Sequence, residues 1–241
     1  MQRRALLLTL LLFGCGPAQT TNVAEMSWQL FYSDGSGPVT CQAAGLDDVN
    51  VTFHPLPAPP NPPNYMWIIG PCTAVPARVV GLPAGDYDFD VTLSNFESFA
   101  RTRGGPVTFG PPVPEELGCL GCGQPNADAW MPPPLQLPPV PVEVSAFKLS
   151  WSLDSPAGAL CSQVGARRVA LETTRDGKPL KNQFFDCEPG HAFSVAINPG
   201  VYTYRFRLLG DEDAQLAVSD VHTIRVNDRE MPALDARFTL R

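Results

Sequence analysis

The chain of 241 residues combines many prolines and glycines with few charges, and this composition excludes several classes of protein. Its 27 prolines, 20 glycines and only 17% charged residues favour many short strands and turns over long helices. The net charge of −7 argues against a nucleic-acid partner, because such partners are bound by basic patches that replace the counterions of the phosphates.

The first sixteen residues have the pattern of a targeting signal. Arg3 and Arg4 form a basic start, an apolar run follows at residues 5–13, and a small residue stands directly before Cys15. The run is far shorter than the ~20 apolar residues that a membrane-spanning helix needs. The segment resembles the signal peptide of a bacterial lipoprotein, with residues 12–15 matching the lipobox.

The lipoprotein resemblance implies removal of residues 1–14 as a signal peptide and a lipidated tether at residues 15–24. Its partner would be membrane lipid, reached through an acylated Cys15, at an address in the cell envelope. Gly16 after the cysteine, in place of Asp, favours the outer membrane of a Gram-negative bacterium. An ordinary secretory signal is the alternative. However, an odd thiol is a liability in an exported protein, and seven cysteines become an even six once Cys15 carries lipid.

The rest of the chain repeats itself. Each copy opens on a Trp-x-Leu motif and continues through a cysteine, a glycine, a second cysteine, a second glycine and a tyrosine. These anchors are Trp28, Leu30, Cys41, Gly45, Cys72, Gly85 and Tyr87 in the first copy and Trp151, Leu153, Cys161, Gly165, Cys187, Gly200 and Tyr202 in the second. Length differences fall between the anchors, where surface loops permit them. We therefore expect two domains, at residues 25–142, including a proline-rich insertion, and at residues 143–241.

Alternation of apolar and polar residues predicts strands within each copy. Residues 87–93 and 202–208 alternate strictly, which is typical of strands that bury one face. Asp176-Gly177 predicts a tight hairpin, whereas residues 55–63 of the first copy predict an extended, proline-rich loop. Residues 236–240 predict a last strand in the second copy, and we expect its equivalent in the first copy at about residues 135–137.

The Trp-x-Leu strand, the cysteine pair and the Gly-x-Tyr opening of a late strand resemble tandem immunoglobulin-like and prealbumin-like sandwich modules of bacterial surface proteins. The resemblance covers about residues 25–112 and 144–241. It implies an all-β fold of two tandem, disulfide-bonded antiparallel β-sandwich domains after the signal peptide. Trp28 and Trp151 precede both cysteines of their copies, unlike the tryptophan of an immunoglobulin domain, which lies between them. The choice between the two topologies stays open.

Because the repeat places the cysteines alike, we expect each copy to close its own bridge, from Cys41 to Cys72 and from Cys161 to Cys187. An exported protein meets the oxidising conditions that such bridges need. Cys119 and Cys122 have no counterpart in the second copy. A local disulfide that closes a glycine-rich loop, a thioredoxin-like redox pair and half of a zinc site are all open; we favour the disulfide.

The motifs of common enzymes are missing from the sequence. There is no G-x-S-x-G, no H-E-x-x-H and no phosphate-binding glycine loop, and the three histidines are isolated. We therefore expect no catalytic residues, no metal and no cofactor. The favoured function is a non-catalytic binding or scaffold protein, anchored by lipid, with an envelope protein as partner. The alternative is a glycan-binding surface lipoprotein that uses the aromatic side chains of Tyr65, Trp67 and Trp130.

Overall fold

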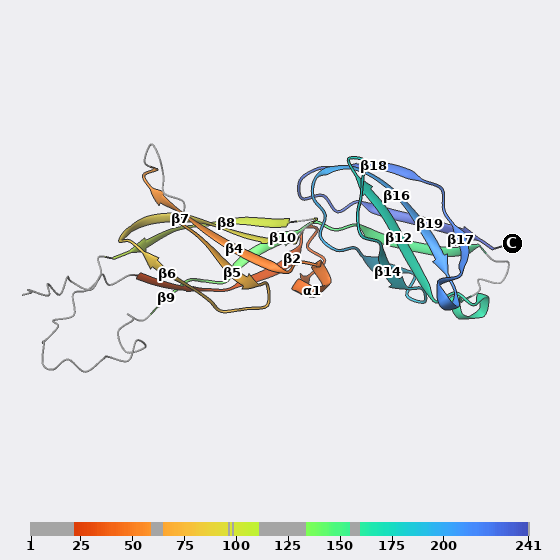
Figure 1. Ribbon diagram of the computed structural model, residues 1–241, viewed down its shortest axis with the longest axis horizontal. Coiled ribbons are helices and arrows are strands. Elements are labelled where there is room, and N and C mark those ends of the chain that lie inside the picture. Colours follow the sequence, from red (N-terminus) through yellow and green to blue (C-terminus); the bar gives the residue numbers. More distant parts are fainter. Residues whose placement is uncertain are drawn as a thin grey trace, which may run out of the picture.

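The computed structural model describes residues 22–58, 65–95, 97, 99–110, 134–154 and 160–240. These residues form two β-sandwich modules, one after the other along the chain (Figure 1). We call β1–β10 the first module and β11–β19 the second module. Each has its own hydrophobic core, one built almost wholly from residues 24–144 and the other from residues 147–238. The fold is therefore all-β, as the sequence predicts.

The first module consists of two layers. In one layer, β1 and β2 form a nearly continuous strand, with β6 and β9 beside β1, and β3 and β10 beside β2. These strands are β1 (Asn22–Met26), β2 (Trp28–Tyr32), β3 (Pro38–Val39), β6 (Ala77–Leu82), β9 (Leu135–Gln136) and β10 (Val140–Val144). The other layer is a four-stranded sheet in the order β5 (Tyr65–Pro71), β4 (Asp48–Leu56), β7 (Gly85–Ser94) and β8 (Phe99–Phe109).

The second module repeats this plan. One layer has the order β15 (His191–Phe193), β11 (Lys148–Asp154) and β19 (Ala233–Thr239). In the other layer, β12 and β16 form the centre, with two short strands on each side. These strands are β12 (Arg168–Arg175), β13 (Lys178–Pro179), β14 (Gln183–Asp186), β16 (Gly200–Leu209), β17 (Gln215–Val218) and β18 (His222–Val226).

The last strand of each module lies parallel to its Trp-x-Leu strand, whereas most other pairs are antiparallel. In the second module β19 pairs with β11, and in the first module β10 pairs with β2. A strand forms at residues 135–136, where β9 lies beside β1, but the counterpart of the last strand in the repeat is Val140–Val144, in which alternate valines are buried. The sequence therefore places the closing strand a few residues too early. Pro141 argued against a strand here, because proline lacks the N–H that a central strand needs. β10 lies at the edge of its sheet, where proline is tolerated.

The first two long strands of each module lie in different layers. β2 and β4 belong to separate sheets, as do β11 and β12. In a constant-type immunoglobulin domain the first two strands share a sheet. The strand order therefore differs from that arrangement, although the two-layer sandwich is the same.

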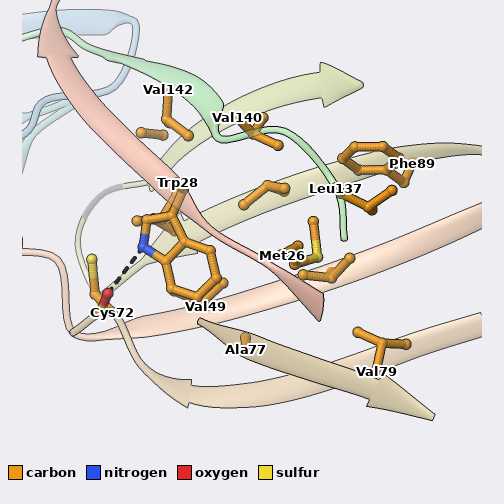
Figure 2. Packing of buried hydrophobic residues seen from close by; sticks show 14 of the residues in the cluster. Met26, Trp28, Val49, Cys72, Ala77, Val79, Phe89, Leu137, Val140 and Val142 are labelled. Carbon is orange, nitrogen blue, oxygen red and sulfur yellow. Dashed lines mark hydrogen bonds between the residues drawn. The ribbon is translucent and has the colours of Figure 1, made fainter. Parts of the chain in front are cut away.

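A tryptophan connects the two layers in the same way in both modules. The Nε1–H of Trp28 donates to the carbonyl oxygen of Cys72 at 2.9 Å, and that of Trp151 donates to Cys187 at 2.8 Å. Figure 2 shows Trp28 reaching from its strand to Cys72 within the apolar core. A buried indole N–H needs such a partner, so the repeat preserves both the ring and its acceptor.

The equal spacing from cysteine to glycine corresponds to one helical turn. Cys41 begins α1 (Cys41–Ala44), and Cys161 begins a short 3₁₀ turn. Gly45 and Gly165 end these turns with φ of 63° and 71°, a left-handed conformation that favours glycine. The disulfides join Cys41 to Cys72 and Cys161 to Cys187, the pairs that the repeat predicts.

The tight turn in the second module also forms as predicted. Asp176 and Gly177 have φ of 51° and 79° and connect β12 to β13. In the first module, however, part of the expected loop at residues 55–63 belongs to a strand, because β4 continues to Leu56 and pairs there with β7. Residues 59–63 lie outside the described residues.

We expect removal of the second disulfide, by Cys161→Ala with Cys187→Ala, to destabilise the second module. The bridge closes a loop of 26 residues, which corresponds to about 3.5 kcal/mol of chain entropy in the unfolded state. Urea unfolding would measure the loss. Lys178→Ala, at an exposed position, is the control and should change stability little. Equal stability of the double variant and the parent would contradict a stabilising role of the bridge.

Candidate binding site at the module junction

The aromatic residues proposed from the sequence are only partly placed by the structure. Tyr65 and Trp67 lie on β5, half-buried against the first core, with their rings stacked at 6.2 Å. The Trp67 Nε1–H donates to the carbonyl oxygen of Val80 on β6 at 3.1 Å. Trp130 lies outside the described residues, as do Cys15, Cys119 and Cys122. Glycan binding by these aromatic residues stays a prediction.

The two modules contact one another through a turn that the sequence did not single out. Glu97, between β7 and β8, accepts hydrogen bonds from three groups of the second module. Its carbonyl oxygen accepts hydrogen bonds from Arg175 Nη1 at 2.9 Å and from Asn198 Nδ2 at 3.3 Å. Its Oε1 accepts a hydrogen bond from the backbone N–H of Lys181 at 3.1 Å. The Phe99 N–H donates to Asn198 Oδ1 at 3.0 Å. A single turn of the first module thus binds two separate segments of the second.

A second set of contacts involves α1. The backbone N–H of Ala196 donates to the carbonyl oxygen of Ala44 at 2.8 Å, and Ala196 is buried in the core of the first module. Gly45 lies against Val195 so closely that a Cβ added to the glycine would stand 2.7 Å from Val195 Cγ1. Glycine is therefore required here both by its backbone conformation and by the approach of the second module.

An aromatic pair and an ion pair complete the junction. Tyr32 and Phe193 stack with their ring centroids 4.4 Å apart. Lys148 Nζ lies 2.6 Å from Asp34 Oδ2. Hydrogen bonds from Lys148 and from Ser36 lower the pKa of Asp34 to about 2. Backbone, apolar and charged contacts therefore all hold one module against the other.

The junction leaves a groove of about 530 Å³ between the modules. Its apolar part comes from the second module, with Phe184, Phe185, Phe193 and Val195. Its polar rim includes Asp47 and Glu97 of the first module and Lys181, Asn182 and Gln183 of the second. A concave surface that combines apolar side chains with polar groups at its rim is a common form of binding site. We call this hollow the junction groove.

A smaller hollow of about 320 Å³ near the same boundary contains arginines that already have partners. Arg101 Nη2 lies 2.5 Å from Asp90 Oδ2, and His54 Nε2 lies 2.7 Å from the same oxygen. Burial raises the pKa of Asp90, but the bonds from Arg101 and His54 outweigh burial and leave this pKa below its usual value. This cluster is a charge-paired surface of β4, β7 and β8. We therefore regard the junction groove as the stronger candidate site.

Sequence reasoning missed the residues of the junction because no motif connects them. Glu97, Lys181 and Asn198 are polar residues in turns, where such residues are common. The Gly45 anchor was the one available signal, since the repeat marks it, but its second role depends on Val195 in the other module.

No group of three or more His, Cys, Asp and Glu side chains that could hold a metal occurs within the described ranges. Across that same part of the chain, the structure also contains no helix of the length and apolar character needed to cross a bilayer.

Comparisons with known proteins find likenesses in structure alone. No protein-family model and no curated protein matches the chain. A candidate adhesin from Bacteroides ovatus is 11% identical with a TM-score of 0.32, over 92% of this chain and 93% of that one. A streptococcal ancillary pilin is 9% identical with a TM-score of 0.28, and the match covers 93% of this chain and 63% of the pilin.

The pilus adhesin SpaC from Lactobacillus rhamnosus GG is 11% identical with a TM-score of 0.27, over 90% of this chain and 31% of SpaC. TM-scores of this size support no inference about what this chain binds. The β-sandwich fold is established by its own strands and sheets.

Gly45→Ala should loosen the junction, whereas Gly165→Ala should not. Both glycines have positive φ, so each alanine costs roughly 1–2 kcal/mol. Only the Cβ at position 45 meets another side chain, Val195, whereas nothing lies within 4 Å of the Cβ at position 165. Overpacking adds about 1–3 kcal/mol. Urea unfolding and small-angle X-ray scattering would measure stability and module spacing. Equal effects of the two variants would contradict the close contact with Val195.

The contribution of Asp34 to stability should depend on pH in acid solution. Its folded pKa of about 2 lies below the ~3.9 of an unfolded Asp, so the ionised form favours folding. This contribution is complete above pH ~4 and declines as the pH falls towards 2. Urea midpoints of the parent and Asp34→Asn should therefore differ at pH 6 and converge near pH 2. A difference that stays constant across this range would contradict the assignment.

Proposed function

We propose that this protein is a non-catalytic binding or scaffold protein of the cell envelope, anchored by lipid at Cys15. The sequence places the tether at residues 15–24 and the domains at residues 25–142 and 143–241. Because β1 begins at Asn22 and β10 ends at Val144, the tether would end before Asn22 and the first domain would extend to Val144. Two or more acyl chains give stable attachment, whereas a single chain gives only marginal attachment. The address would be the outer membrane of a Gram-negative bacterium, on the grounds of Gly16.

The observation that supports this function best is the position of the first strand relative to the junction. Figure 1 shows β6 and β9, the strands on either side of β1, at the end of the first module farthest from the second module. β1 begins at Asn22, only a few residues after Cys15. An anchor at Cys15 would therefore hold one end of the molecule at the membrane, with the second module at the other end.

The contacts at the junction support a scaffold rather than two independent domains. Glu97, Ala44 and Asp34 each bind a different segment of the second module. Interfaces between domains of one chain commonly allow relative motion unless they are extensive. Here the combination of backbone hydrogen bonds with interlocked side chains favours one orientation, in which the junction groove stays open to a partner.

Fatty-acid labelling of growing cells tests the anchor. An alkyne analogue of palmitate should label the native protein and the Cys119→Ala variant, and Cys15→Ala should abolish the label. Mass spectrometry of the mature protein should find an amino terminus at Cys15. A label that persists in Cys15→Ala, or a mature chain that begins elsewhere, would overturn the anchor. Cys119→Ala controls for general effects of removing a cysteine.

A further inference from the structure

The junction groove runs along the free edge of a strand. Phe184 and Phe185 are neighbours on β14, so their side chains point to opposite faces of the sheet. Both nevertheless line the groove. Two successive residues of a strand line one groove when that groove follows the edge of the strand. One edge of β14 pairs with β12, and within the described chain no strand pairs with the other edge.

A free strand edge offers unpaired backbone N–H and C=O groups to another chain. Addition of an extended peptide to such an edge is a common mode of recognition, in which backbone bonds provide affinity and side-chain pockets provide specificity. In the first module the corresponding edge strand, β5, is joined to β6 by the indole of Trp67. This bond joins β5 to a strand of the opposite layer.

The side chains around β14 define the chemistry of the partner. Phe184 is 50% exposed and Phe193 is 37% exposed, so both present apolar surface to an incoming chain. The rim contains the carboxylates of Asp47 and Glu97 and the cation of Lys181. The guanidinium of Arg168 lies 5.3 Å from the centre of the Phe184 ring, but its charge is already paired with Asp213. An acidic rim beside apolar rings is complementary to a chain in which apolar and basic residues occur together.

We propose that the junction groove binds an extended peptide segment of a partner protein by strand addition to β14. The apolar side chains of the peptide pack on Phe184 and Phe193, and a Lys or Arg of the peptide lies beside Asp47. This proposal rests on the binding function proposed above and names the class of partner. It does not depend on the lipid anchor, because the groove consists only of described residues of the two modules.

Selection from a phage library of random peptides, with the full mature chain in detergent micelles as bait, tests the proposal. The enriched peptides should combine β-branched or aromatic residues with Lys or Arg. Synthetic copies should bind Phe184→Ala at least about tenfold more weakly than the parent. Asp47→Lys should weaken binding of the basic peptides to a similar extent.

Met66→Ala is the control, because Met66 is 61% exposed on β5 and lies outside the junction groove. Thermal unfolding would verify that each variant is folded. The proposal is overturned if no peptide is enriched, or if the enriched peptides bind Phe184→Ala and the parent equally. It is also overturned if only oligosaccharides on a glycan array bind in a Phe184-dependent way. If the native protein carried no fatty-acid label but still bound the peptides, the lipid anchor at Cys15 would be rejected and the peptide site would stand.

Discussion

One hydrogen bond, from a tryptophan indole to a cysteine carbonyl, organises each half of this molecule. Trp28 stands on β2 and Trp151 on β11, the Trp-x-Leu strands of the two modules, and their acceptors are cysteines of the two disulfides. The bond joins the leading strand to the opposite layer, and the disulfide joins the same cysteine to the turn that precedes the next strand. Since small domains have modest net stability, two such links in each module account for the survival of the same pattern in both copies.

The repeat made the fold predictable within each module but not between them. The spacing from Cys41 to Gly45 corresponds to a helical turn that ends in a left-handed glycine. The alternation of residues 87–93 and 202–208 corresponds to strands that bury one face in a core. These features are local, so the sequence contains them. The closing strand at Val140–Val144 was misplaced because its parallel pairing with β2 is not local, and because Pro141 interrupts the pattern.

The junction between the modules could not be predicted from the sequence either, and the physical reason is different. Its contacts join residues about a hundred positions apart, such as Glu97 with Asn198. No motif or periodic pattern indicates these contacts, because an interface between two copies of a repeat involves different surfaces of each. Gly45 illustrates the limit: the repeat shows that a glycine is needed to end a turn, and only the structure shows that Val195 also needs the space.

The junction groove connects the two levels of organisation. Its apolar wall comes from β14, from β15 and from Val195 of the second module, and both carboxylates of its rim, those of Asp47 and Glu97, belong to the first. A peptide held between Asp47 and Phe184 would contact both modules at once. By linkage, a ligand that binds only the docked arrangement also stabilises that arrangement. Binding and the relative orientation of the modules are then two aspects of one equilibrium, so a change at Asp34, which lies outside the groove, would alter affinity without contact with the peptide.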